Sequence, residues 1–257
     1  MKSEHTEPEL KPGGRAVAIR NMFSSVAGRY DLANRIMSLG RDLFWREALA
    51  RRIKVLDPPG FLLDLAAGTG DQIIAAKKAR PDMKVVGLDF SSGMLELAKP
   101  KLKTLPSPTP ELVCGDALDL PFDDGLFDSV SISFGLRNIA ERAALYQEVL
   151  RVLKPGGRFL VLEAYHDRNS LWAPAVEFYM RQIVPTLGGR IVSREYEAYS
   201  YLISSIMSFP RPEALAEEMR AAGFISPAGR SYTFNTVMLV QAERPGSEAA
   251  EIKKGHD

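Results

Sequence analysis

The strongest structural signal in this chain is the stretch Phe61-Leu62-Leu63-Asp64-Leu65-Ala66-Ala67-Gly68-Thr69-Gly70-Asp71. Its apolar first half predicts a short buried strand, the two glycines predict a tight turn, and a helical pattern begins at Asp71. Glycine permits positive φ and a close approach of the backbone to a ligand. The free N–H groups in the first turn of the helix point toward the same place. We therefore expect a cradle for a nucleotide-like ligand, with an ordinary strand–turn–helix corner as the alternative.

The residues around this turn restrict the ligand. The dinucleotide fingerprint has a third glycine three residues after the second, and here Ile73 stands at that position. A phosphate-binding loop needs Gly-Lys-Ser/Thr, but Asp71 follows Gly70, and its carboxylate would repel a pyrophosphate. S-adenosylmethionine fits better, because it has an adenosine, a cationic sulfonium and an amino-acid end but no phosphate.

Composition excludes several protein classes. The chain has 257 residues, of which 46% are hydrophobic and 25% charged, and these values favour a single α/β domain. A net charge of +1 predicts no nucleic-acid partner. Cys114 is the one cysteine, and His5, His166 and His256 are far apart, so we expect no intramolecular disulfide and no metal site. No long apolar run and no signal-like segment after Met1 are present, which favours the cytoplasm.

The order of the predicted elements defines the fold class. Strand and helix patterns alternate from Phe61 onward, and the last two strands are joined by so short a link that they should form a hairpin. We therefore predict a doubly wound, mainly parallel seven-stranded α/β sheet with an antiparallel C-terminal strand and helices on both faces. The expected strands are 61–65, 84–89, 112–114, 127–134, 158–163, 226–232 and 236–242, and the helices between them are 71–80, 91–103, 141–153 and 212–222.

The remaining segments suggest how this domain is bounded. Residues 1–20 read as a flexible arm and 244–257 as a flexible tail, so 21–243 should form one domain. Within it, 21–55 is expected to be a helical cap with a break at Gly40, and 167–210 a helical lid insertion. Both segments are rich in aromatic residues and methionine. They could line an adaptable apolar pocket or form a second layer of core.

Polar residues gather where the predicted strands end. Ligands of open α/β sheets bind beyond these carboxyl ends. Asp89 ends the second strand, about 25 residues after Asp64, where a carboxylate can accept both ribose hydroxyls. Asp116 could accept an adenine amino proton, and Ala117 offers a backbone N–H. One such acid could be a helix cap, but several together predict a site. The expected cofactor-binding residues are Asp64, Gly68, Thr69, Gly70, Asp89, Asp116, Ala117 and Ser133.

A set of stretches between about Met22 and Arg244 carries a family resemblance. They are Met22–Asp31, Leu63–Asp71, Leu120–Phe122, Phe127–Asp128, Ile132–Asn138, Arg151–Arg158 and Leu162–Glu163. The chain resembles the Rossmann-like class I S-adenosylmethionine-dependent methyltransferases, and more closely the menaquinone/ubiquinone biosynthesis C-methyltransferases. The resemblance implies cofactor contacts from Thr69, Asp89, Asp116, Ala117 and Ser133. Two positions depart from the family: Ala67 stands where glycine is common, and Asp116 where asparagine is also found.

The resemblance also implies a reaction, in which a methyl group moves from S-adenosylmethionine to a ring carbon of a prenylated demethylated quinol, such as demethylmenaquinol. The reduced quinol is expected to be the nucleophile, because an oxidised quinone ring is electron-poor. Arg137, Asn138 and Tyr30 are the candidate catalytic residues that would stabilise or orient the phenolic oxygen. A structural ion pair is the alternative role for Arg137, and Glu163 and His166 are weaker candidates for a direct base.

Several alternatives remain open at this stage. The acceptor could instead be a prenylated benzoquinol of ubiquinone biosynthesis or another small molecule that is methylated on oxygen or nitrogen. A non-catalytic scaffold that only binds the cofactor would keep the glycine turn and Asp89 but would not need Arg137 or Tyr30. A prenylated substrate implies transient contact with a membrane surface, so a peripheral location is an option beside the cytoplasm. A homodimer is an option for the oligomeric state.

Overall fold

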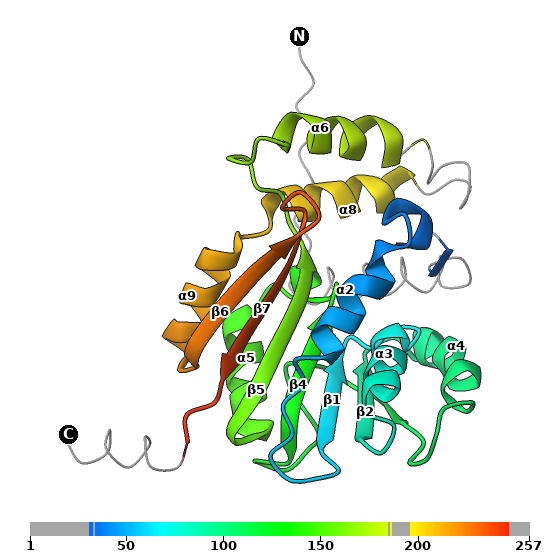
Figure 1. The fold of residues 1–257 in the computed structure, drawn as a ribbon, viewed down its shortest axis with the longest axis vertical. Coiled ribbons are helices and arrows are strands. Elements are labelled where there is room, and N and C mark those ends of the chain that lie inside the picture. Colours follow the sequence, from blue (N-terminus) through cyan, green and yellow to red (C-terminus); the bar gives the residue numbers. More distant parts are fainter. Residues whose placement is uncertain (1–30, 33, 185, 187–195, 247–257) are drawn as a thin grey trace, which may run out of the picture.

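The computed structural model describes residues 31–32, 34–184, 186 and 196–246, and the fold is a central sheet covered by helices on both faces (Figure 1). The expected arm at 1–20, the first part of the cap and most of the tail lie outside these residues. The strands are β1 (Phe61–Leu65), β2 (Lys84–Asp89), β3 (Glu111–Cys114), β4 (Phe127–Ser133), β5 (Leu153–Ala164), β6 (Ile225–Tyr232) and β7 (Val237–Glu243). The main helices are α2 (Arg41–Ala50), α3 (Asp71–Ala79), α4 (Ser92–Leu102), α5 (Arg142–Val152), α6 (Ala173–Phe178), α8 (Tyr196–Ser208) and α9 (Pro212–Ala222).

The seven strands form one sheet in the order β3-β2-β1-β4-β5-β7-β6. β1 pairs in parallel with both β2 and β4, so the strand order reverses between β1 and β4. This reversal is the place where open α/β sheets bind ligands. β7 is antiparallel to both β5 and β6. The predicted mainly parallel seven-stranded sheet is therefore confirmed, and the C-terminal strand β7 is antiparallel to both of its neighbours, as predicted.

Alternating residues of the parallel strands supply a core on each face of the sheet. Leu63 and Leu65 of β1 pack on the face covered by α5 and α9, where Val149 and Met219 are buried. Leu62 packs on the opposite face, together with side chains of α2, α3 and α4. β1 is therefore buried on both sides, and its carboxyl end holds the glycine turn rigidly.

The start of β5 differs most from the prediction, and several other strand ends differ by one residue. β5 begins at Leu153 rather than Arg158, because Leu153 already pairs with Phe127 before an irregular stretch restores the register at Arg158. Gly156 adopts a φ of +76°, which glycine tolerates without steric strain, and this conformation permits the irregularity. The link from β6 to β7 is a turn of three consecutive residues with positive φ, Thr233, Phe234 and Asn235. Left-handed backbone in non-glycine residues is uncommon and is enriched at functional sites.

Helices cross above the carboxyl ends of the parallel strands. Figure 1 shows α6 and α8 across this end of the sheet, with the β6–β7 link beside α8. A five-residue π-helix, Tyr179–Ile183, continues α6, and these elements form the described part of the predicted helical insertion. Residues 31–32 and 34–37 are helical, and Gly40, with φ +75°, separates them from α2 as predicted. No helix among the described residues is long and apolar enough to cross a membrane.

Candidate active site

The glycine turn after β1 is bound directly to the end of β2. Gly68 and Gly70 adopt φ +55° and +84°, in the region that favours glycine. Asp89 accepts hydrogen bonds from Gly68 N–H at 2.8 Å and from Ser91 N–H at 2.9 Å, one on each carboxylate oxygen. Burial raises the pKa of Asp89, while the two backbone hydrogen bonds act in the opposite direction. Each oxygen keeps a further acceptor position, as recognition of two ribose hydroxyls requires.

The loop after β3 lies beside this carboxylate. Gly115 N–H donates to the Asp89 carbonyl at 3.1 Å, which places the following residues next to the end of β2. Asp116 is exposed, and its carboxylate accepts a hydrogen bond from Leu118 N–H at 2.9 Å. Ala117, the next residue, packs against the core of the sheet. The structure therefore brings the predicted adenine-contacting residues and the predicted ribose-binding residue to one edge.

Thr69 connects the turn to the described start of the helical cap. Its hydroxyl donates to Asp31 at 2.6 Å, and Lys101 of α4 bridges Asp31 at 2.9 Å and Asp71 at 2.7 Å. Arg35 also pairs with Asp71, at 3.0 Å. Partial burial acts to raise the pKa of Asp71, but Lys101 and the nearby arginines outweigh it and the pKa is lowered. The expected repulsion of a pyrophosphate by Asp71 needs correction, since two cations compensate this charge.

Ser133 ends β4 on the other side of the reversal point. Its hydroxyl donates to Gln72 Oε1 at 3.2 Å. The ends of β1 and β4 approach closely there, because a Cβ at Gly135 would lie 2.6 Å from that of Ala66. Ala66 and Phe134 both have positive φ, 50° and 58°. The left-handed residues thus flank the predicted cofactor site.

Asp64 lies beneath the turn rather than at its surface. Its side chain is completely buried and accepts a hydrogen bond from Ser131 at 2.6 Å. Burial raises the pKa of Asp64 to about 7, although the Ser131 hydrogen bond and the charge of Arg46 oppose this effect. Its predicted contact with the cofactor stays a prediction.

This raised pKa makes a prediction about stability and pH. The folded-state pKa of about 7 exceeds the ordinary value of 3.8. At pH values between these two, the Asp64 carboxyl is protonated in the folded state and loses its proton on unfolding. Rising pH therefore destabilises the fold. From about pH 5 to about pH 8, wild type should lose on the order of 3 kcal/mol more unfolding free energy than Asp64→Asn. Urea denaturation at several pH values measures the difference. Parallel pH profiles for the two proteins would contradict the assignment.

Arg137 lies in a 3-10 turn, Leu136–Asn138, directly after β4. Its guanidinium pairs with Glu163 at 2.5 Å and donates to the Phe134 carbonyl at 2.8 Å. Glu163 also accepts hydrogen bonds from the backbone N–H groups of Arg137 and Ala164. The ion pair that was the alternative role for Arg137 is therefore present, and the same side chain also lines the cavity described below. Glu163, held by three donors, is poorly placed to act as a base.

The other predicted catalytic residues have different positions. Asn138 accepts a hydrogen bond from the Tyr201 hydroxyl of α8 at 3.1 Å, so it connects the 3-10 turn to the insertion. His166 is buried and pairs with Glu177 of α6 at 3.0 Å. Tyr30 lies outside the described residues. Asp31, Lys101, Gln72 and Arg46 were not predicted as site residues.

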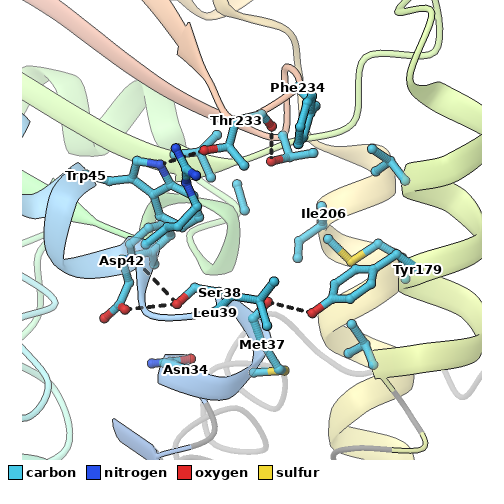
Figure 2. A pocket seen from close by; sticks show the side chains of 18 of the residues that line it. Asn34, Met37, Ser38, Leu39, Asp42, Trp45, Tyr179, Ile206, Thr233 and Phe234 are labelled. Carbon is cyan, nitrogen blue, oxygen red and sulfur yellow. Dashed lines mark hydrogen bonds between the residues drawn. The ribbon is translucent and has the colours of Figure 1, made fainter.

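A cavity of about 480 Å³ lies between α2, the α6 and π-helical segment, α8 and the β6–β7 link. Figure 2 shows Trp45 from α2, Tyr179 from the π-helix and Ile206 from α8 around this space, with Phe234 at its edge. The few polar groups there are largely engaged with each other: Trp45 Nε1 donates to Thr233, and the Tyr179 hydroxyl donates to the Met37 carbonyl. Apolar residues of the cap and insertion therefore line a pocket, whereas others, such as Phe209, pack in the core.

Arg137 and Phe134 also line this cavity. Both follow β4, the strand whose last residue, Ser133, contacts the first turn of α3 through Gln72. The apolar cavity thus extends to residues that follow β4, next to the reversal point of the sheet. Among the described residues, no group of three or more His, Cys, Asp or Glu side chains could hold a metal ion.

A sequence model of the ubiE/COQ5 methyltransferase family matches residues 11–243 of this chain. The chain belongs to the ubiE/COQ5 methyltransferase family. This membership agrees with the arrangement of the sheet, the glycine turn and the acid at the end of β2, and confirms the resemblance read from the motifs.

Individual relatives agree with this assignment. The chain is 41% identical to a Deinococcus radiodurans protein named demethylmenaquinone methyltransferase, over 87% of this chain and 92% of the relative. It is 38% identical to a Geobacter sulfurreducens protein named ubiquinone/menaquinone biosynthesis C-methyltransferase UbiE, over 88% of each chain. A Thermotoga maritima structure titled SAM-dependent methyltransferase has the same fold, with a TM-score of 0.61 at 18% identity, over 88% of this chain and 99% of that chain.

Proposed function

We propose that this family member methylates a ring carbon of a prenylated demethylated naphthoquinol, with S-adenosylmethionine as the methyl donor. The observation that carries the proposal is an apolar cavity whose wall includes Phe134 and Arg137, the residues that follow β4 beside the reversal point of the sheet. The names of the relatives support a quinone-type acceptor. When bound, S-adenosylmethionine supplies an electrophilic methyl group on a sulfonium.

The residues around the turn fit this donor. The glycine turn leaves backbone open to a ligand, and the Asp89 carboxylate has acceptor capacity for two ribose hydroxyls. Asp116 and Ala117 would contact the adenine, and Thr69 and Ser133 would lie along the methionine end. Asp64, beneath the turn, would favour the nearby cationic amine.

Arg137 is proposed to stabilise the phenolate of the substrate. The Glu163 carboxylate and the Phe134 carbonyl fix its guanidinium in one orientation, so little reorganisation is needed as charge develops. The phenolic proton leaves to water, and the adjacent ring carbon forms a bond to the methyl carbon as the methyl–sulfur bond breaks. Loss of the hydrogen on that carbon restores the aromatic ring and the hydroxyl is reprotonated, so one proton is released overall.

The hydrogen bond between Asn138 and Tyr201 suggests a positioning role for Asn138. It ties the 3-10 turn that presents Arg137 to α8, which also supplies Leu202 and Ile206 to the cavity wall. The ring would lie near Arg137, and the prenyl tail would extend between the helices. The cavity is in the range of typical small-ligand sites, about 300–1,000 Å³.

Competition between acceptors tests the choice of substrate. A mixture of reduced demethylated naphthoquinol and benzoquinol, each with a short prenyl tail, is incubated with the protein and S-adenosylmethionine. We expect the naphthoquinol to gain a methyl group at least about 10-fold faster, since its second ring buries more apolar surface. Faster methylation of the benzoquinol would move the assignment to ubiquinone biosynthesis. Methylation on oxygen, detected by fragmentation of the product, would contradict C-methylation.

Exposed apolar side chains near the cavity support a transient membrane contact. Leu171, Trp172 and Phe234 are 98%, 53% and 57% exposed, and the rings of Trp172 and Phe234 lie 4.6 Å apart. Trp172 and Phe234 also line the cavity, so a prenylated substrate could pass from the bilayer along this surface. Co-sedimentation with phosphatidylcholine vesicles tests this idea. Protein that stays in the supernatant at every lipid concentration would contradict it.

A further inference from the structure

Arg46 of α2 is a buried cation without an ion-pair partner among the residues that the structure describes. The residue is 8% exposed. Across the described parts of the chain, its guanidinium makes no hydrogen bond or ion pair, and its Nε is fully buried without a hydrogen-bond partner. A buried charge that lacks hydrogen bonds is costly, and buried arginines are normally paired. The position of Arg46 therefore calls for an explanation beyond packing.

The surroundings of Arg46 place it between the glycine turn and the cavity. Its guanidinium lies over the ring of Phe134, 5.2 Å from the centroid, and Arg46 lines the cavity. Its backbone carbonyl faces the side-chain amide of Gln72 at 3.5 Å, and Gln72 also contacts Ser133. Burial raises the pKa of Asp64, and the charge of Arg46 opposes this rise; the same charge helps to lower the pKa of Asp71. These contacts place Arg46 close to Gln72 and Ser133, and the proposed function assigns Ser133 to the methionine end of the donor.

The carboxylates closest to this region already have other partners. Asp64 accepts from Ser131, and Asp71 pairs with Lys101 and Arg35. Asp42, on the same helix, pairs with Arg35 and Ser38. These described carboxylates are therefore engaged elsewhere, and an anionic oxygen of a ligand would satisfy the Arg46 guanidinium. A guanidinium presents two parallel N–H groups that match both oxygens of a carboxylate, whereas a phenolate offers only one.

We propose that Arg46 binds the carboxylate of the methionine moiety of S-adenosylmethionine and makes the site selective for donors that carry this carboxylate. The inference rests on the proposed function, because it assumes that donor. Phe134 would hold the guanidinium flat against its ring through a cation–π contact. Burial strengthens the pairing, since the guanidinium is already out of bulk water before the ligand arrives.

Decarboxylated S-adenosylmethionine is the probe for this role, because it differs from the donor only in lacking the carboxylate. Isothermal titration calorimetry measures the Kd of both compounds for wild type, Arg46→Met and Arg46→Lys. We expect wild type to bind S-adenosylmethionine about 10- to 100-fold more tightly than the decarboxylated compound, from the loss of a charged hydrogen-bonded pair. In Arg46→Met the two Kd values should agree within about 3-fold, because only the binding of the carboxylated compound weakens. Arg46→Lys should give an intermediate ratio of the two Kd values, since lysine keeps the charge but lacks the two parallel N–H donors of the guanidinium.

The matched control is Arg51→Met, at the end of the same helix, where the arginine side chain is 73% exposed. It should keep the wild-type ratio of the two Kd values. The ratio is measured on one preparation of each variant, so a general loss of folded protein does not imitate the effect. Equal weakening of both compounds in Arg46→Met, or an unchanged ratio, would overturn the inference. If wild type bound neither compound, the proposed donor itself would be wrong, and this inference would be overturned with it.

Discussion

Replacement of Arg137 by methionine is expected to lower kcat by about 100- to 1,000-fold, the typical loss when one preorganised donor to a developing oxyanion is removed. The affinity for S-adenosylmethionine should stay within about 3-fold of wild type, since a phenolate contact adds to catalysis without being used in donor binding. Single-turnover kinetics with a reduced naphthoquinol, together with calorimetry of donor binding, measure the two quantities separately.

The ion pair with Glu163 complicates this experiment and also supplies its control. Arg137→Met leaves Glu163, whose side chain is fully buried, without its cation, and losing one partner of a buried pair costs roughly 3–5 kcal/mol of stability. The double variant Arg137→Met/Glu163→Gln removes both charges. It should recover much of the stability but none of the activity. A double variant with near wild-type kcat would mean that Arg137 has only a structural role.

Replacement of Asp89 by alanine is the second prediction with a large effect. The carboxylate holds Gly68 and Ser91 through their N–H groups, and it is proposed to accept both ribose hydroxyls. Each hydrogen bond to a charged group contributes about 1.5–3 kcal/mol, so the Kd for S-adenosylmethionine should rise by at least about 100-fold. Calorimetry with S-adenosylmethionine and with S-adenosylhomocysteine checks this result.

A matched control separates loss of this contact from a general loss of negative charge. Asp124 precedes β4 at the opposite end of the sheet, and its side chain is 77% exposed. Asp124→Ala should leave the Kd unchanged. A Kd for Asp89→Ala within about 5-fold of wild type, on the scale of a single weak hydrogen bond, would show that Asp89 only stabilises the turn.

Much of the fold was predictable because local and periodic signals agree. Leu62, Leu63 and Leu65 mark a strand buried on both faces, and Gly68 and Gly70 mark the turn that follows it. The start of β5 at Leu153 was not predictable in this way. Pro155-Gly156-Gly157 is a strong helix stop, but it does not reveal that Leu153 pairs with Phe127 across the sheet. Pairing partners far apart in sequence depend on tertiary structure, which local patterns do not contain.

The candidate site was predictable to the extent that it follows strand ends. Asp89 and Ser133 end strands, and Arg137 lies in a distinctive motif, so position or resemblance identifies them. Lys101 and Arg46 lie within helices in which charged residues are common. A charged residue on a helix usually faces solvent, so burial of Arg46 beside Phe134 becomes visible only after α2 has packed onto α3. The ion pair of Arg137 with Glu163 likewise needs the adjacent placement of β4 and β5.

The most direct test of the proposed activity is mass spectrometry of a demethylated, short-tailed naphthoquinone after incubation with the protein and S-adenosylmethionine carrying a deuterated methyl group. The same acceptor is supplied once in chemically reduced form and once oxidised. We predict that the quinol gains one labelled methyl group on a ring carbon and that the oxidised quinone gains none, because only the electron-rich ring can attack the methyl carbon. Equal labelling of both forms, or no labelling of the quinol by protein that binds the donor, would contradict the proposed reaction.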